Sequence, residues 1–235
     1  MLNVVVTGWP RADLDAVDAL TEFGVATVHE AIGRSGYLGA SIRPAWPGVR
    51  VGGTAVTALC WPGDNLMIHA AVEHCRAGDI LVVTTASPST DGAFGELLAT
   101  SLRHHGVRGL VTTGGVRDVA ELQAIGFPVF SAAICAQGTV KATAGAVNVP
   151  VSIGGQRIAP GDAIIADDDG VVVVPRAAVT GAVAAARARV TRETATRAAL
   201  AAGELGIDRY GLRTVLADQG VEYLDYETYL RRAEL

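Results

Sequence analysis

The sequence predicts an α/β fold built in layers, an α/β/β sandwich followed by a C-terminal helical tail. Between residues 80 and 125, two apolar strand patterns are each followed by a helix pattern, which is typical of strands joined by helical crossovers. After Pro128, runs of β-branched residues alternate with Gly and Pro turns, which favours a second, mostly β layer. The segment 177–202 is rich in alanine and other good helix formers, and it predicts a long tail helix.

The first elements expected are two short helices at 13–23 and 25–34 and an alternating strand at 51–59. A helix at 65–76 follows, with Asp64 in position to cap it. These elements precede the two strand–helix units.

The strand–helix units comprise a strand at 80–84 with a helix at 97–105, and a strand at 107–113 with a helix at 118–125. Glycine loops at Gly95 and at Gly114-Gly115 then fall at the same end of the sheet, where ligands of α/β proteins usually bind. The remaining elements expected are strands at 147–153, 163–166 and 171–174 and helices at 177–202 and 208–219.

Length and composition indicate one main domain. With 235 residues, half of them apolar, the chain can bury one substantial core, and no Ser/Pro-rich linker divides it. We expect an α/β domain at 1–176 with its N-terminal helices, and a tail at 177–235 that packs on a neighbouring subunit. The net charge of −5, without a basic patch, disfavours nucleic acid and membranes as partners and favours a small molecule.

The cysteines and the N-terminus predict a cytoplasmic protein. Cys60, Cys75 and Cys135 are widely spaced and odd in number, which suits buried, reduced thiols. No apolar run reaches the roughly 18 residues of a membrane span. Met1-Leu2-Asn3 lacks the charged start of a signal peptide.

Chemistry-bearing residues concentrate around the two glycine loops. Arg117 has a planar guanidinium that can hold a carboxylate through two hydrogen bonds. Asp118 would offer a hard oxygen to Mg²⁺ or Mn²⁺, which takes only one or two protein carboxylates. Asp118 with Glu121 also has the spacing of a helix cap, and we expect Glu121 either to cap the helix or to support the metal site without contacting the metal.

A second anion-binding feature is the start of the helix at 97–105. Backbone N–H groups of the first helical turn lack partners within the helix and face an anion with the helix dipole behind them. Gly95, Leu97 and Leu98 would act through these N–H groups, and the leucine side chains are expected in the core.

Other candidate sites are weaker. Asp167-Asp168-Asp169-Gly170 resembles a cation loop, but a tight hairpin turn is the favoured interpretation. The five histidines, His29, His69, His74, His104 and His105, show no zinc-ligand spacing and are expected in the core or on the surface. No Gly-x-Gly-x-x-Gly or Walker loop is present, so no nucleotide or organic cofactor is expected. Lys141, the only lysine, is the sole candidate for a Schiff base, and a structural or electrostatic role is favoured.

The chain resembles the class II 4-hydroxy-4-methyl-2-oxoglutarate/4-carboxy-4-hydroxy-2-oxoadipate aldolases, which share the RraA-like swivelling-domain fold with the regulator of RNase E activity. The motif that carries the resemblance is Glu96, twenty residues, Arg117-Asp118 and then Glu121. It continues from about residue 63 to 225 through the segments Gly138-Thr139-Val140-Lys141, Val147-Asn148-Val149-Pro150-Val151, Pro160-Gly161-Asp162 and Ala166-Asp167-Asp168-Asp169-Gly170-Val171. Glu96 replaces the aspartate often found in the family, and Thr113 stands where many members carry aspartate.

The resemblance implies roles for these residues. Asp118 would contact the metal directly, Glu96 would act through a bound water, and the backbone at Gly95, Leu97 and Leu98 would hold the pyruvate carboxylate. A glutamate from a neighbour's tail, here Glu193, would complete the site in a trimer or a dimer of trimers. A salt bridge of Glu193 with Arg189 or Arg197, four residues away, is the alternative.

The expected activity is a metal-dependent retro-aldol cleavage of a 4-hydroxy-2-oxo di- or tricarboxylic acid to pyruvate and a second 2-oxo acid. Because oxaloacetate decarboxylation passes through the same enolate, that lyase activity is expected beside it, as a side or main reaction. The alternative is a non-catalytic regulator that binds a partner protein such as RNase E. The tail after about Arg176 favours the enzyme.

Overall fold

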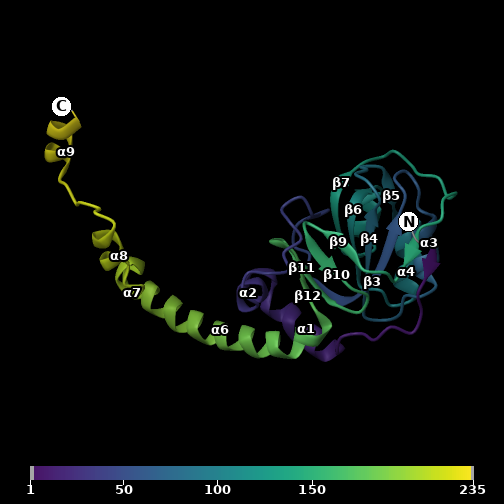
Figure 1. The fold of residues 1–235 in the computed structure, drawn as a ribbon, viewed down its shortest axis with the longest axis horizontal. Coiled ribbons are helices and arrows are strands. Elements are labelled where there is room, and N and C mark those ends of the chain that lie inside the picture. The colour runs from purple at the N-terminus through teal and green to yellow at the C-terminus, as the bar shows by residue number, and fades with distance from the viewer. Residues whose placement is uncertain (1–2, 234–235) are drawn as a thin grey trace. The chain divides into compact units, whose positions relative to one another are not determined.

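The computed structural model describes residues 3–233. Met1 and Leu2, which were part of the prediction that the chain lacks a signal peptide, lie outside the described residues. The chain divides into two compact units, residues 1–190 and 191–235. The first unit holds every strand of the described chain, and the second holds only helices and their connections (Figure 1).

The first unit is built around a mixed sheet. Its centre is four parallel strands in the order β3 (Val51–Cys60), β4 (Asp79–Thr85), β6 (Gly109–Val116) and β7 (Val129–Ile134). Shorter strands extend this sheet, namely β1 (Val4–Val5), β2 (Arg43–Pro44), β5 (Gly92–Phe94) and β8 (Ala146–Val147). The parallel strands therefore end at one common edge, as the strand–helix pattern predicted.

Three helices cover one face of this sheet: α3 (Leu66–Val72), α4 (Glu96–His104) and α5 (Val119–Ala124). The core between them contains Val56 and Leu81 from the strands and Ile68 and Leu102 from the helices, all fully or almost fully buried. Successive side chains of a strand point to opposite faces of the sheet. Ile80 and Val82 therefore face away from these helices and pack into a second core.

A second β layer covers that other face. It comprises the hairpin of β11 (Ala163–Asp167) and β12 (Gly170–Val174) and the pair β9 (Val151–Ile153) and β10 (Gln156–Ile158). The hairpin is continuous with the central sheet, because β11 pairs antiparallel with β3, whereas β9 and β10 form a sheet of their own. On β11, Ile164 faces the central sheet and Ile165 faces outward. The outward face is covered by α1 (Leu14–Phe23), α2 (Val25–Ala31) and the first turns of α6 (Val179–Ala201).

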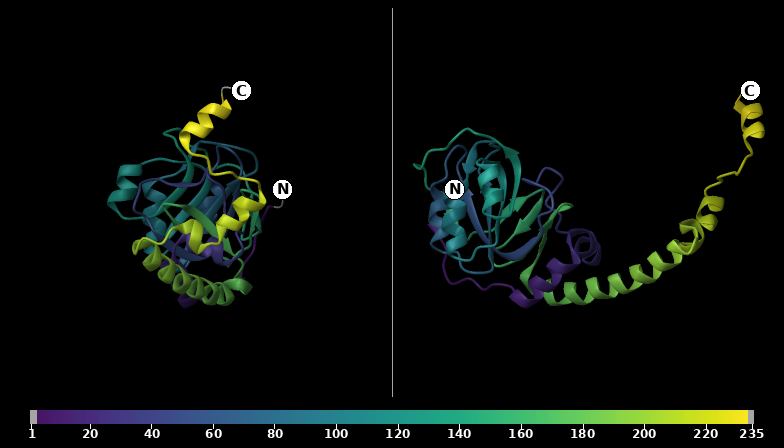
Figure 2. Two further views of the ribbon diagram at one scale, coloured as in Figure 1. Left: turned by 90° about the vertical axis from the view of Figure 1, so that its left-hand side faces the viewer. Right: turned by 180° about the vertical axis from the view of Figure 1, so that it is seen from behind.

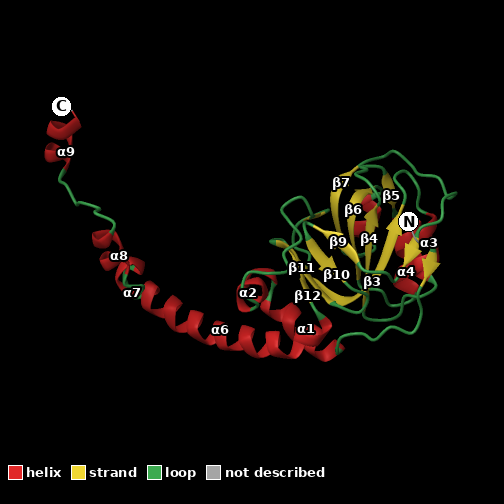
Figure 3. Ribbon diagram, viewed as in Figure 1, coloured by secondary structure: helices red, strands yellow, loops and turns green. Residues whose placement is uncertain are grey.

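These layers confirm the predicted α/β/β sandwich and add an outer helical cover. Within the first unit, strands gather in the middle and helices lie outside them (Figure 3). Viewed from behind, the blue-teal helices and the purple helices α1 and α2 lie on different sides of the strands of the first unit (Figure 2).

The second unit continues α6 and contains α7 (Gly206–Arg209), α8 (Leu212–Asp218) and α9 (Tyr226–Ala233). The single helix predicted at 208–219 is wrong, because Gly211 takes a left-handed φ of 65° and separates α7 from α8. No helix within residues 3–233 has the length and apolar character needed to cross a membrane.

Two further predictions of local structure are corrected. Gly114 and Gly115 do not form a loop but continue strand β6. Glycine is needed at position 115 because a Cβ there would lie 2.1 Å from the Thr90 carbonyl oxygen. The strand expected at 147–153 is broken at Asn148, whose φ is 58°. The hairpin interpretation of the aspartate run is confirmed, because Asp167 pairs with Gly170 across a two-residue turn.

Candidate active site

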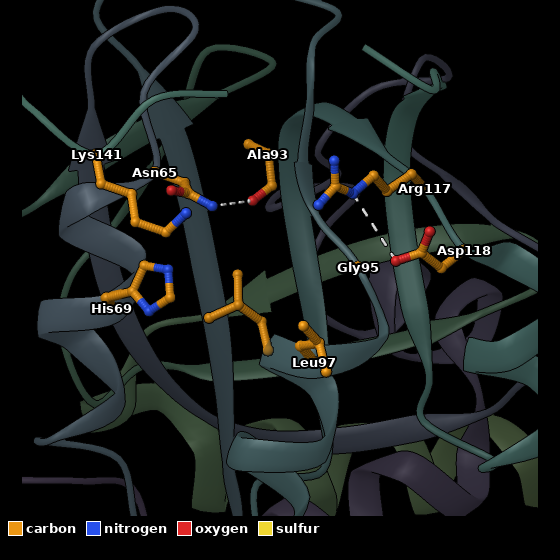
Figure 4. Close-up of a pocket in the computed structure, with 9 residues that line it drawn as sticks. Asn65, His69, Ala93, Gly95, Leu97, Arg117, Asp118 and Lys141 are labelled. Atoms are coloured by element: carbon orange, nitrogen blue, oxygen red, sulfur yellow. Dashed lines mark hydrogen bonds and ion pairs between the residues drawn. The ribbon is translucent and has the colours of Figure 1, made fainter. Parts of the chain in front are cut away.

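A pocket opens where the parallel strands end. Its walls come from the start of α3, from β5, from the first turn of α4, from the segment after β6 and from the loop before β8. The lining residues are Asn65, His69, Ala93, Gly95, Leu97, Leu98, Arg117, Asp118 and Lys141. Five of the site residues predicted from the sequence therefore lie in one pocket, two of them on the wall opposite the asparagine, histidine and lysine (Figure 4).

Arg117 and Asp118 form one wall. Both side chains are partly open to solvent, with 46% and 41% exposed, and Arg117 Nε lies 3.8 Å from Asp118 Oδ2. The Arg117 backbone N–H donates to the Phe94 carbonyl at 2.9 Å, which ties the end of β6 to β5. A guanidinium and a carboxylate are thus presented side by side to the pocket.

The Asp118 carboxylate is aimed at the N-terminus of α4. Its Oδ2 accepts a hydrogen bond from the Glu96 backbone N–H at 3.1 Å. Glycine at position 95 permits this approach, because a Cβ there would lie 2.3 Å from Asp118 Oδ2 and 3.1 Å from Arg117 Cγ. Gly95 itself has extended backbone, so its role here is close packing and not a left-handed turn.

The sequence allowed Asp118 to cap the helix that follows it, and this prediction is wrong for the Asp118 side chain. Asp118 stands at the N-cap position of α5 but makes no side-chain cap hydrogen bond there, and its φ of 57° and ψ of 40° are left-handed. Aspartate is among the few residues other than glycine that adopt this conformation at modest cost. The unusual backbone turns the carboxylate away from its own helix and toward α4.

The predicted acidic residues other than Asp118 lie elsewhere. The Glu96 carboxylate accepts from Thr100 Oγ1 at 2.6 Å on the flank of α4, and Glu96 is absent from the pocket lining. Glu121 is exposed on α5. Glu193 belongs to the second unit. Leu97, expected in the core, is 81% exposed at the pocket, whereas Leu98 is buried.

The opposite wall contains Asn65, His69 and Lys141, which were not predicted as site residues from the sequence. Asn65 is only 8% exposed; its Nδ2 donates to the Ala93 carbonyl at 2.9 Å, while its buried Oδ1 has no hydrogen-bond partner. That oxygen points to the side on which Lys141 lies (Figure 4). Lys141 extends over His69, so a cation, an imidazole and an unsatisfied acceptor share this wall.

His69 is held toward its neutral form. Burial lowers the pKa of His69 below its usual value, and the positive charge of Lys141 lowers it further. A sequence signal for this wall did exist: Asn65 and His69 are four residues apart on a helix that follows a strand of the parallel sheet, and such residues share one helix face.

The donor set fits a hydrated Mg²⁺ or Mn²⁺ better than zinc. Among the described residues, no three His, Cys, Asp or Glu side chains are grouped to hold a metal, whereas a zinc site needs three or four such ligands. Mg²⁺ keeps several waters and needs only one or two carboxylates. Asp118, whose Oδ2 accepts the Glu96 N–H, is the one carboxylate in the described lining of the pocket that could hold such a cation.

Replacing Gly95 by alanine should displace this carboxylate. The added methyl group would meet Asp118 Oδ2 at 2.3 Å, so the carboxylate must move. Because misplaced groups are costly in active sites, we expect kcat/KM for the retro-aldol cleavage expected from the sequence to fall at least tenfold. Gly114→Ala is the matched control, because its Cβ would meet no atom closer than 3.5 Å. Equal kcat/KM values for the two variants, measured with purified protein, would contradict the packing argument.

The fold and the pocket together define an α/β protein that presents an arginine, an aspartate and a helix N-terminus at the carboxyl edge of a parallel sheet. The chain belongs to the RraA-like family, because the family model described as Aldolase/RraA matches residues 16–173.

Relatives and solved structures agree with this assignment. A protein of Halalkalibacterium halodurans is 27% identical over 85% of this chain and 95% of its own length, and one of Burkholderia multivorans is 37% identical over 57% and 80%. Both carry the name "Putative 4-hydroxy-4-methyl-2-oxoglutarate aldolase". The chain is also similar to the crystal structure of Streptomyces coelicolor RraAS2, described as an unusual member of the RNase ES inhibitor RraA protein family. The TM-score is 0.71 and the sequence identity is 30%, over 81% of this chain and 99% of that one.

Proposed function

We propose that the protein is a divalent-metal-dependent lyase that cleaves a 4-hydroxy-2-oxo dicarboxylic or tricarboxylic acid to pyruvate and a second 2-oxo acid. The observation that carries this proposal is a pocket with two separate polar walls, Arg117 and Asp118 on one side and Lys141 on the other. Such an arrangement suits a substrate with a carboxylate at each end. The names of the relatives support the same chemistry.

The 2-oxo acid end of the substrate is assigned to the first wall. Its C1 carboxylate faces the first turn of α4, where the N–H groups at Leu97 and Leu98 have no partners within the helix by virtue of their position. Arg117 donates to the C1 and C2 oxygens. Asp118 would hold Mg²⁺ or Mn²⁺, and such a cation would supply charge neutralisation to the substrate oxygens.

The reaction begins with loss of the C4 hydroxyl proton to a water. Glu193 of a neighbouring subunit would hold this water, because the Glu96 carboxylate accepts from Thr100 outside the pocket lining. The C3–C4 bond then breaks, C4 becomes a carbonyl carbon, and the electron pair passes through C3 to the C2 oxygen. Arg117 binds this oxygen more strongly as its negative charge develops, which lowers the barrier. Protonation at C3 completes pyruvate. Oxaloacetate can lose carbon dioxide through the same enolate.

The distal end of the substrate is assigned to the second wall. Lys141 offers a cation to the far carboxylate, and neutral His69 offers a ring N–H. Asn65 Oδ1 is a buried acceptor without a partner, and leaving such a group unsatisfied costs about 1 to 3 kcal/mol. Asn65 shapes this wall through the hydrogen bond that its Nδ2 donates to the Ala93 carbonyl.

A regulator without catalytic activity is the second candidate, favoured by the similarity to RraAS2. A steady-state assay distinguishes the two functions. With 4-hydroxy-4-methyl-2-oxoglutarate and Mg²⁺, the protein should release pyruvate, EDTA should stop the release, and added Mg²⁺ or Mn²⁺ should restore it. Turnover that persists unchanged in EDTA would exclude the metal-dependent lyase.

Lys141 is not required as a nucleophile in this proposal. Lys141→Ala should retain a fair share of kcat, while KM rises about tenfold or more because a charge-assisted contact to the distal carboxylate is lost. Borohydride added with pyruvate should leave the mass of the protein unchanged. A mass increase equal to reduced pyruvate on Lys141 would instead establish a Schiff-base mechanism.

We also propose that the working site is shared between subunits of a homotrimer or a dimer of trimers, with Glu193 supplied by a neighbouring chain. Two observations support this arrangement: Glu193 is the one acidic residue of α6, and the family that the sequence resembles supplies a glutamate from a neighbour's tail at the matching position. In it, the proton acceptor and the Arg117–Asp118 wall come from different chains.

A further inference from the structure

A buried carboxylate beneath the second wall joins the two segments that form it. Asp64 is 3% exposed. Its Oδ1 accepts from the Leu66 N–H at 2.8 Å, and its Oδ2 accepts from the N–H groups of Ala142 at 2.9 Å and Thr143 at 2.7 Å. One carboxylate therefore binds both the start of α3 and the loop that carries Lys141.

Backbone hydrogen bonds lie beside this carboxylate. Asn65 N–H donates to the Val140 carbonyl at 2.9 Å, and Val140 N–H donates to the Gly63 carbonyl at 2.9 Å. Farther along the loop, Trp61 Nε1 donates to the Ala144 carbonyl at 3.0 Å. Residues 141–145 form no helix or strand, so these few bonds decide where the loop lies.

The Asp64 carboxylate is ionised in this setting. Burial raises the pKa of Asp64, but the hydrogen bonds from Leu66, Ala142 and Thr143 lower it more, and the net result is a pKa below the usual value. Hydrogen bonds from N–H groups to an ionised carboxylate are about twice as strong as those between neutral groups. The linkage between the helix and the loop is therefore firm at neutral pH.

The geometry points to Asp64 as a positioning residue for substrate recognition: its carboxylate holds Lys141 opposite Arg117 and beside Asn65 and His69, and so sets the affinity for the distal carboxylate without touching the substrate. This role rests on the proposed function for its kinetic consequence. Its structural consequence, the placement of Lys141, does not depend on activity.

The placement of Lys141 can be measured directly, because it is the only lysine of the chain. Reductive methylation with ¹³C-formaldehyde gives a single dimethyl-lysine signal besides that of the N-terminal amine. In Asp64→Asn, the side chain loses its charge and keeps only one accepting oxygen for three N–H donors. The loop should therefore be held more weakly, and the signal should move toward the shift of free dimethyl-lysine. The matched control is Asp162→Asn, a buried carboxylate that accepts from the Ala159 and Arg176 N–H groups outside the pocket.

Kinetics then test recognition. Asp64→Asn should raise KM for 4-hydroxy-4-methyl-2-oxoglutarate about tenfold while kcat falls less than threefold, and the inhibition constant of pyruvate, which has one carboxylate, should stay within twofold. Asp162→Asn should leave all three values near those of the unaltered protein. If Asp64→Asn does not fold by circular dichroism, Thr143→Pro removes one loop N–H donor and leaves the Leu66 contact in place.

Each outcome has a separate meaning. An unmoved lysine signal in a folded Asp64 or Thr143 variant overturns the positioning role, whatever the activity. Equal changes in KM for the Asp64 and Asp162 variants would reduce Asp64 to a general stabilising residue and also overturn it. A moved signal in a protein that never turns over the substrate would leave the positioning of Lys141 supported and would refute the lyase function instead.

Discussion

Asp118→Ala should lose at least about 10³-fold in kcat, and excess Mg²⁺ or Mn²⁺ should not restore it. The proposed metal has one protein carboxylate in the described pocket, and a bound cation provides several kcal/mol of charge stabilisation, of which each 1.36 kcal/mol is a factor of ten in rate. The measurement is pyruvate release at saturating substrate across a metal titration. Glu121→Ala, an exposed acidic residue on the same helix, is the matched control and should remain near full activity.

A subunit-mixing experiment extends this prediction to the shared site. Asp118→Ala and Glu193→Ala chains, each inactive alone, should regain part of the activity after exchange, because hybrid assemblies contain some sites with both residues intact. Two parents that never complement, or a fully active Glu193→Ala variant, would remove Glu193 from the site.

Arg117→Ala should lower kcat by roughly 10² to 10³, the range found when a donor to a developing oxyanion is removed. Arg117→Lys should recover only part of this loss, since a lysine cannot donate two parallel hydrogen bonds to a carboxylate. Arg103→Ala, on the exposed side of α4, controls for the loss of a positive charge near the helix. An Arg117→Ala enzyme with kcat within threefold of the parent would contradict the assigned role.

The sequence was sufficient to predict the layers of the fold because its strands carry strong patterns. In β11 and β12, alternate residues fill two different cores, and both strands read as short runs of Val, Ile and Ala between turn residues. The patterns failed where a single residue changes the backbone direction. Asn148 and Gly211 each adopt a positive φ inside a segment that otherwise continues one element.

The candidate site could be predicted on one side only. Arg117, Asp118 and the first turn of α4 follow one another in short strand–helix connections, so their proximity follows from the order of elements. The other wall depends on a loop that returns to α3 from some 75 residues later, through Asp64 and the backbone at Val140. No local sequence pattern predicts this long-range contact, so the position of Lys141 in the pocket could not be predicted.

The left-handed backbone at Asp118 has a consequence for how the proposed metal ligand could be lost without loss of the fold. A φ of 57° is accepted at low cost by glycine, asparagine and aspartate, and of these three only aspartate carries a charge. A single base change from an aspartate to an asparagine codon would keep the turn, the start of α5 and the fold while removing the proposed metal ligand. In this chain, a change at this one position would therefore separate the proposed metal binding from the architecture.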